Sequence, residues 1–139
     1  LLIVVSEGDP IVGDEFGLKV FQTATCVKRR NFIRQYADSH GFPSISAGHN
    51  EPYALDEQFD TGVRNYSANK ALRVAKVNPV DYLGYWKLGD ALLSCSRDGK
   101  DCQFAFGDTP EQRSQGDWSD GQPVKALQVT VPELETNDY

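Results

Sequence analysis

The stretch that decides the expected fold runs from Gly84 to Phe106 and reads GYWKLGDALLSCSRDGKDCQFAF. It contains two dipeptides typical of tight hairpin turns, Gly89-Asp90 and Asp98-Gly99. Gly at the first loop position suits a type II′ turn, and Asp-Gly suits a type I′ turn because both of its loop residues need positive φ. The sequence therefore predicts a three-stranded antiparallel meander over residues 84 to 106.

The two turns also predict a register for the meander. Each hairpin is registered independently, yet both place apolar side chains on the same face, and a slip of one residue would reverse them. Cys95 then lies opposite Cys102, at a separation that a disulfide can span. Such a face needs a second apolar layer. The expected members of the meander's own apolar face are Trp86, Leu88, Ala91, Leu93, Cys95, Cys102, Phe104 and Phe106.

Other segments are expected to supply that layer. Leu1 to Val5 reads as a strand that is apolar on both faces, whereas residues 16–20 and 124–131 alternate as half-buried strands do. Residues 71–77 alternate with mixed faces, and residues 25–40 carry apolar side chains at helical spacing. The expected fold is mainly β, an antiparallel β-sandwich or a partly open barrel with one short helix.

Size and charge limit the classes of protein to consider. A chain of 139 residues suits one domain, so residues 1–139 are expected to form a single β-rich domain. The net charge of −6 repels phosphate backbones, and nucleic acid is therefore not an expected partner. The longest apolar run, Leu1 to Val5, is far shorter than the roughly 20 residues of a membrane span.

The cysteines bear on the compartment. A disulfide between Cys95 and Cys102 would indicate a protein outside the reducing cytosol, secreted or at the cell surface. The alternative is a pair of reduced core thiols in a cytosolic protein. Cys26 is left over, either as a small buried hydrophobe or as a partner for a second chain. Asn65-Tyr66-Ser67 is an acceptor sequence for glycosylation of Asn65.

Few residues indicate chemistry. Neither His40 nor His49 lies near a Cys or the other His at a metal-binding spacing, so no metal site and no cofactor is expected. In the polar stretch 107–122, Asp117, Trp118 and Asp120 are the candidate ligand-binding residues. An aromatic ring flanked by carboxylates can stack on a sugar while the acids bind its hydroxyl groups. Alternatively, the two acids form a turn and Trp118 covers the core.

A local signal in the same stretch predicts structure. Thr109-Pro110-Glu111-Gln112 matches a capping box with Pro at the first helical position. A turn of helix is therefore expected to begin there.

These observations favour a secreted or surface-exposed binding or assembly module, either a structural subunit or a domain that binds protein or carbohydrate. The strand at Leu1 to Val5 is suited to self-association by adding to a neighbour's sheet. The alternative is a small secreted hydrolase that uses loop carboxylates. Because the sequence singles out none of its twenty acidic residues, a non-enzymatic role is favoured.

Overall fold

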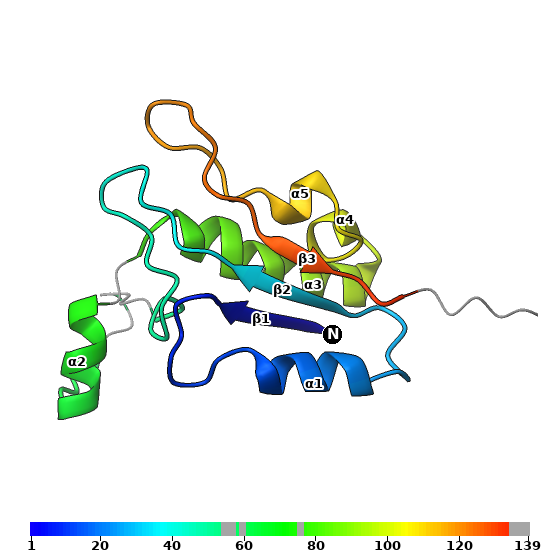
Figure 1. The fold of residues 1–139 in the computed structure, drawn as a ribbon, viewed down its shortest axis with the longest axis horizontal. Coiled ribbons are helices and arrows are strands. Elements are labelled where there is room, and N and C mark those ends of the chain that lie inside the picture. The colour runs from blue at the N-terminus through cyan, green and yellow to red at the C-terminus, as the bar shows by residue number, and fades with distance from the viewer. Residues whose placement is uncertain (54–57, 59–60, 75–76, 134–139) are drawn as a thin grey trace, which may run out of the picture.

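The structure, a computed structural model, describes residues 1–53, 58, 61–74 and 77–133, and for residues 71–74 it describes the backbone only. Helices alternate with the strands of one small sheet (Figure 1). The elements are β1 (Leu2–Ser6), α1 (Glu15–Thr23), β2 (Asn31–Gln35), α2 (Tyr66–Val74), the π-helical segment η1 (Asp81–Trp86), α3 (Lys87–Asp98), α4 (Cys102–Ala105), α5 (Pro110–Arg113) and β3 (Gln128–Thr130). No described helix has the length and apolar character needed to cross a membrane.

The sheet has the order β1-β2-β3. β1 and β2 are parallel, with Leu2 opposite Asn31 and Ser6 opposite Gln35, whereas β3 runs antiparallel to β2. Two parallel strands cannot be joined by a tight turn, and α1 provides the crossover between them. Both parallel strands therefore end at the same edge of the sheet.

Helix α1 covers one face of this sheet (Figure 1). Phe21 of α1 packs on Phe32 of β2, with ring centroids 6.1 Å apart. Gly17 allows a close approach, because a Cβ at this position would lie 3.0 Å from a methyl carbon of Ile3. The opposite face packs on α3 through the buried side chains of Ile33, Leu88 and Leu127.

Because helices cover both faces, β1 needs apolar side chains on both sides. The prediction of a strand at Leu1 to Val5 is therefore confirmed in place, but the strand belongs to a mixed α/β sheet. The expected β-sandwich or barrel is wrong.

The predicted meander over residues 84 to 106 is also wrong, since this stretch forms the end of η1, then α3 and α4. Leu88, Ala91 and Cys95 are buried at successive turns of α3, whereas Leu93 is 69% exposed. Gly99 is the residue that ends α3 and has φ +67°. A Gly in this left-handed conformation is a common end of a helix. The Asp98-Gly99 signal was real, but it marks a helix end instead of a hairpin.

Three further elements differ from expectation. Residues 16–20 lie in α1, and the segment predicted as a helix from 25 to 40 contains β2. Residues 71–74 belong to α2, while residues 75 and 76 of that predicted strand lie outside the described residues. The late strand is confirmed only over Gln128–Thr130. In the first two cases packing on the sheet overrides the local pattern of apolar residues.

The disulfide prediction is confirmed. Cys95 and Cys102 are bonded, with Cα atoms 4.8 Å apart, and the bond joins α3 to α4. The two cysteines meet because the chain reverses at Gly99 between two helices. Cys26 is exposed and free, so the first of its two expected states, a small buried hydrophobe, is wrong.

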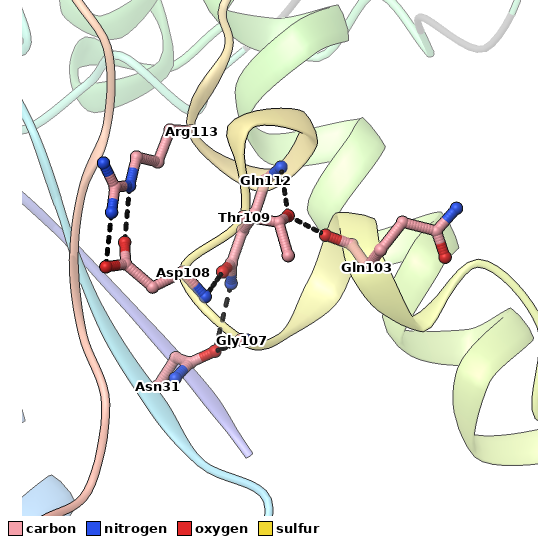
Figure 2. A network of polar contacts seen from close by, with 7 residues as sticks. All are labelled: Asn31, Gln103, Gly107, Asp108, Thr109, Gln112 and Arg113. Atoms are coloured by element: carbon pink, nitrogen blue, oxygen red, sulfur yellow. Dashed lines mark hydrogen bonds and ion pairs between the residues drawn. The ribbon is translucent and has the colours of Figure 1, made fainter.

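A polar network attaches α5 to the start of β2 (Figure 2). The predicted cap is confirmed, since Thr109 Oγ1 accepts from the backbone N–H of Gln112 at 3.1 Å. The buried Gln112 side chain donates to Asn31 Oδ1 at 3.1 Å and accepts from the N–H of Asp108 at 2.9 Å. Arg113 pairs with Asp108 beside this network.

Candidate functional site

The loops that follow β1 and β2 touch at the edge where both strands end. Gly8 forms a parallel bridge with Gly48, and its N–H donates to the carbonyl oxygen of Ala47 at 2.9 Å. A Cβ on Gly8 would lie only 2.9 Å from that same oxygen, so this contact requires glycine. The bridge sets Asp9 and His49, the next residues in each loop, side by side.

Asp9 and His49 form a two-point contact. Nδ1 of His49 lies 3.1 Å from Oδ1 and 3.0 Å from Oδ2 of Asp9. The hydrogen bond uses Nδ1, and no hydrogen bond to Nε2 of His49 is found in the described part of the chain. An imidazole held at Nδ1 by a carboxylate presents its other nitrogen for proton transfer.

The Asp9 carboxylate is held from a second side. The backbone N–H groups of Ile11 and Val12 donate to Oδ1 at 2.9 and 3.1 Å, and the Asp9 side chain is only 14% exposed. The hydrogen bond from His49 and these two backbone amides lower the pKa of Asp9, against a smaller opposing effect of burial. Asp9 is therefore a fixed anion with His49 as its partner.

A small cavity of about 160 Å³ lies on the Asp9 side of this pair, and His49 does not line it. Asp9 lines it together with Arg34, which pairs with Asp14. A larger cavity of about 700 Å³ is lined by Asn31 and Cys102, so it lies where β2 begins, at the other end of the strand from His49.

A tyrosine anchors the end of β1 on the other face of the sheet. The hydroxyl group of Tyr85 lies 3.1 Å from Oγ of Ser6. Burial raises the pKa of Tyr85 to about 12, so this side chain is neutral over the ordinary pH range. Tyr85 also packs against a second core cluster under the loops, formed by Ile45, Val80 and Val124.

The predicted ligand-binding residues lie in a different loop. The ring of Trp118 packs against that second core cluster and on Gly41, and its Nε1 donates to Asp38 Oδ2 at 3.1 Å. Asp120 contacts Nε2 of His40 at 2.8 Å, and Asp117 is exposed. Trp118 therefore packs against the core, as the alternative to ligand binding predicted. The ligand-binding role of the three residues stays a prediction.

Asp38 organises this second loop. Burial acts to raise its pKa, but hydrogen bonds from the backbone N–H groups of His40 and Lys125 and from Trp118 lower it overall. The resulting anion joins residues 38–40 to the loop that carries Trp118. Among the described residues, no group of three or more His, Cys, Asp or Glu side chains is arranged to hold a metal ion.

The comparisons with known proteins add no relative: no family model, no curated protein and no solved structure matches the chain. The Asp9–His49 pair was not singled out from the sequence, because forty positions separate the two residues. One signal was present. Each residue follows a glycine, and Gly8-Asp9 comes shortly after the first apolar strand.

Proposed function

We propose that this chain carries the acid–base pair of a hydrolytic site, with His49 as general base and Asp9 as the carboxylate that orients it. The observation that carries the proposal is the contact of both Asp9 oxygens with Nδ1 of His49, which leaves Nε2 for a reactant. A proton-accepting imidazole oriented by a carboxylate is the standard acid–base unit of ester and amide hydrolysis.

The proposed chemistry needs one nucleophile. Nε2 of His49 takes a proton from a water molecule or hydroxyl group as its oxygen attacks the carbonyl carbon of an ester. Asp9 stabilises the imidazolium that forms, and the proton then passes to the leaving group. Among the described residues no Ser, Thr or Cys side chain bonds Nε2 of His49, and the proposed nucleophile is therefore water.

The position of the pair in the fold supports the proposal. In open sheets with parallel strands, ligands bind outside the carboxyl ends of the strands, and Asp9 and His49 follow the carboxyl ends of β1 and β2. The acid precedes the histidine in the chain, which is the order of these two residues in α/β-hydrolases. This likeness concerns arrangement only and serves as an analogy.

We rank this function above a binding or assembly role for a structural reason. The binding hypothesis drew mainly on the loop of residues 107–122 with Trp118, and the Trp118 ring packs against the second core cluster. The hydrolase alternative drew on loop carboxylates, and Asp9 is one. The Cys95–Cys102 disulfide supports a secreted or cell-surface location for the proposed enzyme. Asn65 is exposed and remains the proposed glycosylation site.

Hydrolysis of p-nitrophenyl acetate by the intact chain tests the proposal. His49→Ala should lower the rate by about 10², because a positioned general base contributes roughly that factor. His40→Ala is the matched control, since it removes the other histidine of the chain, and it should leave the rate unchanged. Equal rates in the two variants would exclude His49 as the base.

A further inference from the structure

His49 lies in a short loop that is closed by one residue. The backbone N–H of Glu51 donates to the carbonyl oxygen of Gly48 at 3.0 Å, and Oε2 of Glu51 accepts from Oγ of Ser46 at 2.5 Å. Glu51 therefore contacts the chain on the N-terminal side of His49 through both its backbone and its side chain. The imidazole is exposed, so the loop around it must supply its position.

The second oxygen of Glu51 ties this loop to the helical layer. Oε1 accepts from Nδ2 of Asn78 at 2.8 Å, and Oδ1 of Asn78 accepts from the N–H of Val80 at 2.8 Å. Glu51 is only 8% exposed, and a buried carboxylate is tolerated only where its oxygens have partners. Both of its oxygens have one.

Asp81, on η1, is a second buried carboxyl that bonds the same asparagine, Asn78, as Glu51 does. It is 0% exposed, and its Oδ2 accepts from the backbone N–H of Asn78 at 2.8 Å, while its Oδ1 has no partner in the described structure. Burial and the nearby charge of Glu51 raise the pKa of Asp81. The surroundings of Asp81 therefore favour its neutral form, next to the Glu51 oxygens that accept from Ser46 and Asn78.

We propose that Glu51 is a positioning residue, whose hydrogen bonds to Ser46 and Asn78 hold the loop in the shape that presents Nδ1 of His49 to Asp9. This inference rests on the proposed function, since it concerns the same pair. Glu51 itself touches neither Asp9 nor a reactant in this scheme. It acts by fixing the backbone conformation of the loop that carries His49.

Nitrogen-detected NMR of the two histidine rings in the folded chain tests this role without any activity. In the wild type, His49 should carry its proton on Nδ1, where Asp9 accepts it, and His40 provides a second histidine signal as internal reference. Glu51→Ala should abolish the Nδ1 proton signal of His49 and leave the His40 signals unchanged. Glu51→Gln should retain the signal, because glutamine still offers an oxygen to Asn78 and an N–H to Ser46.

Each outcome has a distinct meaning. A His49 signal that survives in Glu51→Ala overturns the positioning role and leaves the proposed function intact. A wild-type His49 without a proton on Nδ1 contradicts the proposed function itself. If Glu51→Ala does not fold, Ser46→Ala carries the test, because it removes one of the two bonds at an exposed residue. It should weaken the Nδ1 proton signal, and an unchanged signal overturns the role.

Discussion

Asp9 and Asp120 each contact a histidine, but the two carboxylates differ in what else holds them. Asp9 is 14% exposed and bonds Nδ1 of His49, whereas Asp120 is 55% exposed and bonds Nε2 of His40. Exposed ion pairs contribute little to stability because water and salt screen them. The pair that spares Nε2 is therefore the one we propose for proton transfer, and the other is a surface contact.

The buried carboxyl of Asp81 predicts a pH-dependent stability. Its pKa is raised mainly by burial, so the folded chain keeps this proton to a higher pH than the unfolded chain does. Its contribution to the free energy of unfolding therefore falls as pH rises above the ordinary aspartate value of about 4. Asp81→Asn removes this effect, so the stability of the variant relative to the wild type should rise between pH 4 and pH 7. Urea unfolding from pH 4 to pH 7 measures it.

Asp120→Asn is the control of opposite sign. The hydrogen bond from His40 lowers the pKa of Asp120, so Asp120 stabilises the folded chain above the ordinary aspartate pKa, and this contribution is lost as pH falls. The Asp120→Asn variant should therefore approach the wild type on acidification. Should Asp81→Asn lose stability relative to the wild type between pH 4 and pH 7, as Asp120→Asn does, the raised pKa of Asp81 would be contradicted.

The helical structure of α3 predicts that Leu88 and Leu93 contribute differently to stability, which a strand in its place would not predict. In the expected meander Leu88 and Leu93 shared one apolar face, whereas in α3 Leu88 is 2% exposed and Leu93 is 69% exposed. Leu88→Ala should lower the free energy of unfolding by about 2 to 5 kcal/mol, because it leaves a cavity between α3 and the sheet. Leu93→Ala should change it by less than about 0.5 kcal/mol. Comparable losses in both variants, measured by urea unfolding, would contradict the helix.

Local signals predicted those elements whose residues have one interpretation. The cap at Thr109 and the first strand were recovered because a capping box and a short apolar run depend on nearby residues alone. Helix α3 was missed because Leu88, Ala91 and Cys95 satisfy a helical spacing as well as an alternating one. The Gly at position 99 fits both a hairpin and a helix end, so only packing against the sheet decides between them.

Strand β2 was missed for a different reason. It buries Asn31 and Gln35, and a strand that buries polar side chains does not show the apolar alternation used to find strands. Asn31 is polar because it bonds Gln112. The partner of this buried polar side chain thus lies 81 positions away in the chain.

For the molecule as a whole, the candidate site was beyond prediction from sequence patterns. It requires two parallel strands to end at one edge, and that topology was not expected. The disulfide was predicted correctly from a wrong fold, since any chain reversal near Gly99 brings Cys95 and Cys102 together. Contacts between close positions thus survive an error in secondary structure, and contacts over forty positions do not.

The disulfide gives a prediction for the whole chain. Closing a loop over a sequence separation of 7 should stabilise the fold by about 2 to 3 kcal/mol through the entropy of the unfolded chain. A Cys95→Ser/Cys102→Ser double variant should lose that amount in thermal or urea unfolding. Cys26→Ser is the control, because Cys26 is exposed and free. Equal stability of the double variant and the control would show that the bond contributes nothing.

The absence of a side chain at Gly8 sets the distance between Asp9 and His49. Any side chain at position 8 would press on the Ala47 carbonyl oxygen and wedge the two loops apart. Because Asp9 and His49 follow that point directly, the displacement would reach both without anything in between to absorb it. Gly8 is for that reason difficult to replace, although it has no side chain that could take part in a reaction.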